Sequence, residues 1–136
     1  MCFQGQDVQF RDPLYCQKIN FISLHDPLPD FMSVSSYLEY QQLSADDPLI
    51  RNMDLAQNIA KLSTGMRQRL RLLQLREDAS IYYVDEPFNG LDCQYCELVD
   101  QIFTAKAKKG QLVIYASHIA GHCDQEIDCE TIVSIS

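Results

Sequence analysis

Basic residues are scarce in this sequence of 136 residues, in which 11 lysines and arginines stand against 19 aspartates and glutamates. The formal net charge is −8, so nonspecific nucleic-acid binding is not expected, because it needs cations that neutralise phosphates. Long apolar runs are missing too: the longest, residues 81–84 and 112–116, fall far short of the ~20 needed to cross a bilayer. The opening residues have neither a basic start nor an apolar core, so no secretory signal is predicted.

The composition is that of an ordinary globular chain, with 46 % apolar and 22 % charged residues, and its length suits one domain. Without a signal we expect a reducing compartment, in which disulfides between the six cysteines are disfavoured. Cys93 and Cys96 alone have metal-site spacing, and a zinc ion would need further ligands such as His118, His122 or Cys123. The simpler interpretation is that the thiols pack as small hydrophobes.

Alternating strands and helices are predicted along the chain. Runs of β-branched and aromatic residues, and one alternating stretch, predict strands at 18–24, 80–84, 111–115 and 131–135. The run at 80–84 is apolar enough to be a buried strand. Strands that alternate with helices indicate an α/β fold with a mostly parallel sheet.

Capping residues and apolar spacing predict four helices between these strands. The first begins at Ser33 or Ser35 and reaches about residue 43, and the second covers 54–61. The third is capped by Ser63 or Thr64 and reaches about residue 75, and the fourth runs from Asp92 to about 109, before Gly110. The third helix carries four arginines, at positions 67, 69, 71 and 76, which we expect on a solvated face; the alternative is that they contact phosphates.

Two adjacent carboxylates, Asp85 and Glu86, come directly after the strand at 80–84. Ligands of open parallel sheets bind at the carboxyl ends of strands, and an ionised pair there is costly unless a cation or a reacting water uses it. Asp85 could hold Mg²⁺ through water, and Glu86 could act on a water nucleophile. The alternative is that the two acids begin a turn.

The helix that begins after Ser63, Thr64 and Gly65 directs free N–H groups and a positive dipole end outward. Such a helix start is a ready anion site, and a glycine lets the backbone approach a phosphate closely. The alternative is an ordinary N-cap.

The order of these segments resembles the nucleotide-binding subunit of ABC transporters. Leu-Ser-Thr-Gly-Met at 62–66 is similar to the signature LSGGQ, and Arg-Gln-Arg-Leu at 67–70 is typical of the residues directly after that signature. Residues 81–86 resemble Walker B with its catalytic glutamate, residues 89–92 (Asn-Gly-Leu-Asp) resemble the D-loop, and His118 resembles the switch histidine. The resemblance runs in order from about residue 5 to 135.

The resemblance implies a P-loop NTPase fold of the ABC type, present as one partial domain over 1–136. A small helical subdomain with the signature would cover about 25–76, and 77–136 would run from Walker B to the switch histidine. The implied cofactors are ATP and Mg²⁺. Glu86 and His118 would be catalytic, and Asp85 would hold the Mg²⁺ through water. The implied nucleotide contacts are Ser63, Thr64, Gly65 and Asp92.

The implied partners are a second ABC ATPase subunit, in a head-to-tail dimer, and a membrane permease that the helical subdomain docks. In that dimer the signature grips the γ-phosphate of ATP bound on the partner subunit. The resemblance places the chain in the cytoplasm, at the inner face of the membrane through the permease. Import and export, and the haem-exporter and multidrug types, stay open.

The phosphate-cradling motif G-x-x-x-x-G-K-[ST] occurs nowhere in the sequence. Without this loop the phosphates lose their main donors, and the Mg²⁺ loses a Ser/Thr ligand. We therefore expect a chain that is N-terminally truncated relative to the family and does not hydrolyse ATP alone. His25 or Asp26 stands where the family has its Q-loop glutamine, and Thr64 and Met66 replace the usual signature residues.

Three interpretations stay open. The chain could be a fragment of an ATPase subunit, a non-catalytic partner that lends its signature to an intact subunit, or a remnant of a disrupted gene. In each case the strand at 111–115 would lack a neighbour and one sheet face would lack a helix, so we expect a weakly stable or partner-dependent monomer.

Overall fold

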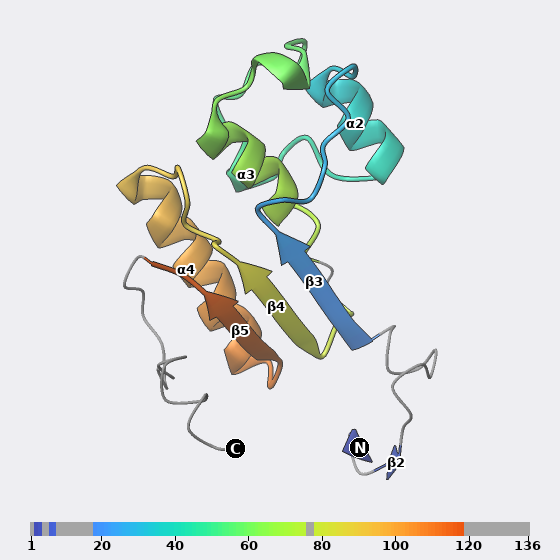
Figure 1. Cartoon of the computed structure of the whole chain (residues 1–136), viewed down its shortest axis with the longest axis vertical. Coiled ribbons are helices and arrows are strands. Elements are labelled where there is room, and N and C mark those ends of the chain that lie inside the picture. The colour runs from blue at the N-terminus through green and yellow to red at the C-terminus, as the bar shows by residue number, and fades with distance from the viewer. Residues whose placement is uncertain (1, 4–5, 8–17, 76–77, 119–136) are drawn as a thin grey trace.

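The structure is a computed structural model that describes residues 2–3, 6–7, 18–75 and 78–118 (Figure 1). The predicted strand at 131–135, the zinc-ligand candidates His122 and Cys123, and Arg76 lie outside these residues. Within the described ranges no helix combines the length and the hydropathy that a membrane crossing requires.

A parallel sheet forms the centre of the described fold, as predicted. Its strands are β3 (Ile19–Ser23), β4 (Ile81–Asp85) and β5 (Leu112–Ala116), in the spatial order β3-β4-β5 (Figure 1). The register places Ser23, Asp85 and Ala116 side by side at the carboxyl ends. A separate antiparallel pair joins β1 (Cys2–Phe3) to β2 (Gln6–Asp7).

Within the described residues three α-helices accompany the sheet, and each begins at a residue whose side chain accepts a backbone N–H of the first turn. The helices are α2 (Val34–Gln41), α3 (Thr64–Leu72) and α4 (Cys93–Lys108). Their N-caps are Ser33, Ser63 and Asp92, all of which are among the caps predicted from the sequence.

The predicted helix at 54–61 is wrong. The chain makes turns there, followed by the short 3₁₀ helix η2 (Ile59–Lys61), and a similar turn, η1 (Pro48–Ile50), precedes it. Asp54 and Asn58 each accept the backbone N–H two residues further on, which offers the chain local bonds that compete with a helix. The N–H of Ile59 donates to the carbonyl of Met32, so tertiary pairing also uses this backbone.

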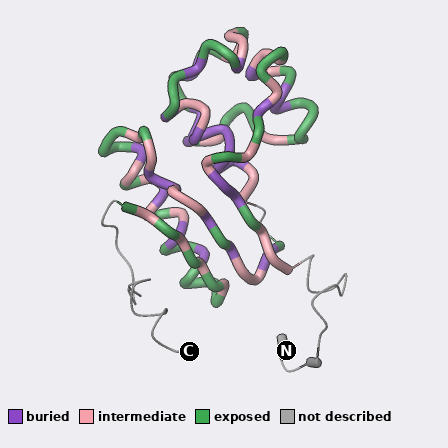
Figure 2. Tube along the Cα trace, in the orientation of Figure 1, coloured by how far each residue is buried: buried purple, intermediate pink, exposed green. Residues whose placement is uncertain are grey.

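Buried residues flank an exposed one along β4 (Figure 2), so one face of the sheet is packed and the other is open. Tyr82 and Val84 of β4 are fully buried and belong to one core with Val99 and Phe103 of α4. The intervening Tyr83 is 38 % exposed, so the expectation that 80–84 is a buried strand holds for one face only. The open face also carries exposed apolar side chains from the other two strands: Phe21, Leu112 and Ile114. Within the described residues β5 is an edge of the sheet.

Residues 24–75, here called the helical segment, run between β3 and β4 and carry α2 and α3 (Figure 1). Its own apolar side chains include Val34, Tyr37 and Ile59, which are almost fully buried. The Nε of Arg71 donates to the carbonyl of Asp26 at 2.9 Å, so α3 is tied to the chain that leaves β3. The helical segment is thereby fixed beside the carboxyl ends of the strands.

Candidate functional site

Asp85 lies at the carboxyl end of β4, next to the end of β3. The hydroxyl of Ser23 donates to Asp85 Oδ2 at 3.2 Å, so two neighbouring strand ends present oxygen atoms together. Asp26 accepts the N–H of Ser23 at 2.7 Å and closes the turn after β3. Of the two candidates for the Q-loop position, the Asp26 carboxylate is therefore engaged locally, whereas His25 is exposed.

Glu86 has a backbone φ of 50°, in the left-handed region that residues with a Cβ rarely adopt. Its N–H donates to the carbonyl of Ala116 at 2.8 Å. Its carbonyl accepts two bonds, from the N–H of Asn89 at 3.2 Å and from Nε2 of Gln68 at 3.1 Å. Strained backbone of this kind persists where the surroundings over-determine it, and it is common at functional sites.

His118 comes to the Glu86 carboxylate from the end of β5. Its Nε2 lies 3.3 Å from Glu86 Oε1, and its N–H donates to Glu86 Oε2 at 3.5 Å. The Glu86 side chain is 17 % exposed, whereas that of His118 is 96 % exposed. The structure therefore brings together the two residues that are predicted from the sequence to be catalytic.

The start of α3 carries the predicted phosphate contacts. The hydroxyl of Ser63 accepts the N–H of Met66 at 3.2 Å and caps the helix. Ser63 and Thr64 are exposed, whereas Gly65 is buried. A Cβ atom built on Gly65 would lie 2.1 Å from the carbonyl oxygen of Gly90, so this glycine is needed for contact with the turn at 89–92.

Asp92 closes that turn and begins α4. Its Oδ1 accepts the N–H of Tyr95 at 3.1 Å, an ordinary N-cap bond. The side chain is exposed, and the turn before it lies against the start of α3 through Gly90. The structure thus places the two predicted phosphate-contact segments, 63–65 and 92, on either side of one backbone contact.

The arginines of α3 do not form a solvated face. Arg69 and Arg71 are buried, because their guanidinium groups donate to backbone carbonyls of the helical segment. Only Arg67, which pairs with Asp30 at 2.7 Å, matches the expectation in part. The long apolar stems of arginine pack readily, and its forked donors can satisfy carbonyls that irregular backbone leaves open.

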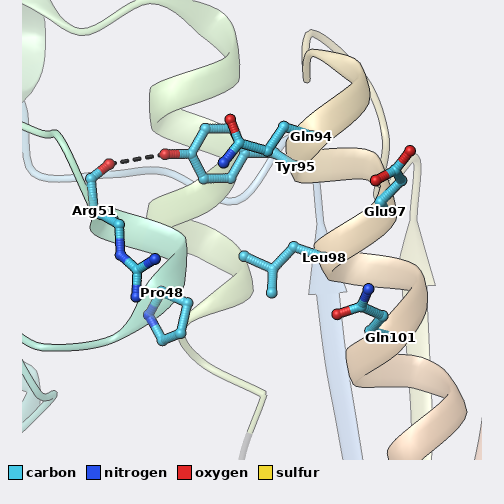
Figure 3. Close-up of a pocket in the computed structure, with 7 residues that line it drawn as sticks. All are labelled: Pro48, Arg51, Gln94, Tyr95, Glu97, Leu98 and Gln101. Carbon is cyan, nitrogen blue, oxygen red and sulfur yellow. Dashed lines mark hydrogen bonds between the residues drawn. The ribbon is translucent and has the colours of Figure 1, made fainter.

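Arg69 joins α3 to η1 and to α4. It donates to the carbonyls of Leu49 and Arg51, and its guanidinium carbon lies 3.7 Å from the centre of the Tyr95 ring. Burial lowers the pKa of Arg69, and nearby Tyr95 and Asp92 oppose the shift. The Tyr95 hydroxyl donates to the carbonyl of Arg51 at 2.8 Å (Figure 3). No local pattern predicts this cluster, because its members are far apart along the chain.

A cavity of about 220 Å³ lies beside this cluster, between η1 and α4 (Figure 3). None of the predicted site residues lines it. Its lining residues are Pro48, Arg51, Gln94, Tyr95, Glu97, Leu98 and Gln101.

Cys93 and Cys96 lie on the first turn of α4 with free thiols. Cys93 is exposed and Cys96 is half-buried, and the Cys96 thiol lies 3.9 Å from the carbonyl oxygen of Leu91. Burial raises the pKa of the Cys96 thiol, and nearby Cys93 and Asp92 add to the shift. In the part of the chain that the structure describes, no three His, Cys, Asp or Glu side chains are grouped to hold a metal.

Comparison with known proteins places this arrangement among ABC ATPases, although no family model matches the chain. A cytochrome c biogenesis ATP-binding export protein of Idiomarina loihiensis is 28 % identical over an alignment of 127 residues that covers 85 % of this chain and 58 % of the relative. ABC transporter I family member 1 of Arabidopsis thaliana is 30 % identical over 115 residues, 77 % of this chain and 50 % of the relative. The chain is a relative of ABC transporter ATP-binding proteins. It spans about half the length of these curated relatives.

The fold of this chain also agrees with solved structures of ABC transporter ATP-binding proteins. A putative ABC transporter ATP-binding protein from Pyrococcus furiosus matches with a TM-score of 0.62 and 22 % identity, covering 90 % of this chain and 66 % of that one. An ATP-binding subunit of an ABC transporter matches with a TM-score of 0.61 and 19 % identity, covering 87 % and 55 %. The predicted α/β fold of the ABC-type P-loop NTPase is therefore confirmed for the part of the domain that this chain contains.

Proposed function

We propose that this chain supplies the signature segment, the Walker B strand and the D-loop of an ATP-hydrolysing ABC transporter subunit. In this proposal it is a single partial domain over 1–136, with a helical subdomain at about 25–76 and the remaining core at 77–136. The observation that carries the proposal is the backbone contact between Gly65 and Gly90 beside the Glu86–His118 pair. Together these two contacts bring residues 63–65, 86–92 and 118, which are far apart in sequence, close to one another.

The start of α3 is the proposed phosphate contact. Thr64 and Gly65 lie in the first turn, where backbone N–H groups have no partner within the helix, and the Ser63 hydroxyl lies beside them. The exposure of Ser63 and Thr64 leaves room for a nucleotide held by a facing subunit. Asp92 lies across the Gly65–Gly90 contact, and in our proposal it completes the nucleotide-facing surface.

The oxygen donors at the strand ends fit a magnesium ion. Mg²⁺ is commonly held by one or two carboxylates together with waters and substrate phosphates, and Asp85 and Ser23 supply such donors. When bound, the ion would neutralise charge that develops on the phosphates. We therefore propose Asp85 as its ligand through water, with Ser23 positioning that carboxylate.

Glu86 is the proposed residue that orients and deprotonates the attacking water. His118 contacts its carboxylate through both the ring and the backbone N–H, and these contacts hold the carboxylate in place. The imidazole is nearly fully exposed, so it can also reach a phosphate placed over the site. Glu86 and His118 thus form the proposed catalytic pair.

The helical segment is the proposed docking surface for a membrane permease. Phe31 is 85 % exposed and Tyr40 is 75 % exposed there, and exposed large apolar side chains are typical of interaction surfaces. Through the permease the chain would lie at the cytoplasmic face of the membrane. The names of several relatives favour the cytochrome c biogenesis class over the multidrug class.

The P-loop has to come from another polypeptide stretch, because the 136 residues contain no G-x-x-x-x-G-K-[ST] motif. We propose that the chain alone neither binds ATP tightly nor hydrolyses it. A calorimetric titration of the full chain with Mg-ATP tests this directly. No binding at micromolar nucleotide is expected, and micromolar affinity would overturn the proposal.

The signature role is tested by co-expression with an ABC ATPase subunit that carries a P-loop. Co-purification is expected, together with ATP hydrolysis that Ser63→Arg abolishes by blocking the start of α3. Ser33→Arg is the matched control, because Ser33 caps α2 in the same way but lies away from the proposed site. Equal effects of the two substitutions would reduce Ser63 to a simple cap.

A further inference from the structure

Gln68 is a fully buried polar residue that none of the proposed catalytic or binding roles uses. Its Nε2 donates to the carbonyl of Glu86 at 3.1 Å, while its Oε1 is buried and has no hydrogen-bond partner among the described residues. A buried amide oxygen without a partner is costly. A side chain retained only for packing would therefore be apolar at this position.

Gln68 lies three residues after Gly65, so the two occupy one face of α3. That face meets the segment after β4 at two points: Gly65 touches the carbonyl of Gly90, and Gln68 holds the carbonyl of Glu86. The start of α3 is thereby joined rigidly to the backbone that carries the Glu86 side chain.

The carbonyl of Glu86 would have a hydrogen-bond donor even without Gln68. The Glu86 carbonyl already accepts the N–H of Asn89 at 3.2 Å, within its own turn. The added bond from α3 acts on a residue whose φ is 50°, a conformation that a Cβ-bearing residue does not hold by preference. The second bond therefore restrains the direction in which the Glu86 side chain leaves the backbone.

We propose that Gln68 is a positioning residue, which holds Glu86 in its left-handed conformation and so sets its carboxylate against His118. This inference rests on the proposed function for the role of Glu86, but not for the contact itself. In this proposal a ligand that binds at residues 63–65 would affect the position of Glu86 through α3. Gln68 touches no reacting group, so its influence is exerted through the backbone alone.

Gln68→Met is the decisive variant, because methionine has a similar length, cannot donate, and removes the unpaired buried oxygen. We expect the melting temperature to stay within about 3 °C of the wild type. Hydrogen exchange on the full chain, without nucleotide, should show about tenfold less protection of the Glu86, Asn89 and Leu91 amides. Protection in the middle of α4 should not change.

Gln74→Met is the matched control. Gln74 also donates its side-chain amide, to the Tyr37 hydroxyl, but it lies beyond the far end of α3. Its substitution should leave the exchange of residues 86–91 unchanged. Equal loss of protection in both variants, or none in Gln68→Met, would overturn the positioning role.

A second readout is ATP hydrolysis at the site that contains Glu86, in a complex with a polypeptide that supplies the P-loop to that site. Gln68→Met should lower kcat about tenfold at unchanged KM for Mg-ATP, because Gln68 makes none of the proposed phosphate or magnesium contacts. If the wild-type complex has no ATPase activity, the proposed function fails and the exchange data alone decide the role of Gln68. If the wild-type complex is active and Gln68→Met behaves like Gln74→Met, the positioning role fails and the proposed function stands.

Discussion

The α-carbon of Gly65 faces the carbonyl oxygen of Gly90 so closely that a Cβ atom on Gly65 would lie 2.1 Å from it. Gly90 itself has a φ of 73°, which glycine adopts without strain. The two glycines thus meet backbone to backbone, where α3 begins and where the turn before α4 reverses. This contact explains why glycine is required at 65 even when no phosphate is bound.

Gly65→Ala should destabilise the protein severely, because neither backbone can move aside cheaply. We expect a loss of about 3 kcal/mol or more in the free energy of unfolding. Gly110→Ala is the comparison: Gly110 has a φ of 80° but open space around it, so only backbone strain of about 1 kcal/mol is expected. Denaturant titrations of both variants measure the difference. A smaller loss for Gly65→Ala than for Gly110→Ala would contradict the close contact.

The Arg69 cluster predicts a second large effect. Arg69→Met keeps the apolar stem but leaves the carbonyl of Leu49 without its donor, leaves that of Arg51 with the Tyr95 hydroxyl alone, and removes the cation above Tyr95. We expect a loss of about 2–3 kcal/mol in unfolding free energy. Arg67→Met breaks a partly exposed ion pair with Asp30 and should cost about 1 kcal/mol or less. Equal losses of unfolding free energy for the two variants in urea titrations would contradict a larger contribution from the buried Arg69 side chain.

Much of this architecture could be predicted from local patterns. Ser63 and Asp92 are recognisable caps, and the three strands carry the expected β-branched and aromatic residues. The failures arise where tertiary contacts override local preference. The helix at 54–61 does not form, because its backbone bonds to residues 32–35.

The buried residues of the site, Gln68 and Arg69, could not be predicted from the sequence for the same reason: their burial depends on tertiary contacts. A glutamine or an arginine within a helix is normally taken as exposed, and Gln68 and Arg69 are buried only because distant carbonyls accept their bonds. The one local signal for Gln68 was its i+3 spacing from Gly65, which places both on the same helix face. Such a signal gains meaning only when the segment that lies against that face is known.

Cys93 and Cys96 lie on the same turn of α4, and we expect their thiols to react at different rates. Burial raises the pKa of Cys96, so less of its reactive thiolate is present at a given pH. Because the folded state then keeps its proton longer than the unfolded state, Cys96 makes unfolding easier as the pH rises above about 9. Iodoacetamide at pH 8 should modify exposed Cys93 several times faster than Cys96, as followed by mass spectrometry of each site. The difference should vanish in urea, and equal rates in the native chain would contradict this prediction.

The open face of the sheet predicts self-association. Phe21 and Tyr83 stack there with ring centres 5.2 Å apart, and Ile114 extends the same row onto β5, an edge strand of the described sheet. Apolar faces beside unpaired strand edges promote association, so the double variant Phe21→Thr/Tyr83→Thr should reduce it in sedimentation experiments at rising concentration. Its unfolding free energy should fall by only about 1 kcal/mol, because both side chains already contact water.

Val84→Thr, on the packed face of the same strand, should instead unfold the chain without relieving association, since it places a hydroxyl in the core. Unchanged association in the double variant would contradict the prediction, because the chain would then associate through another surface.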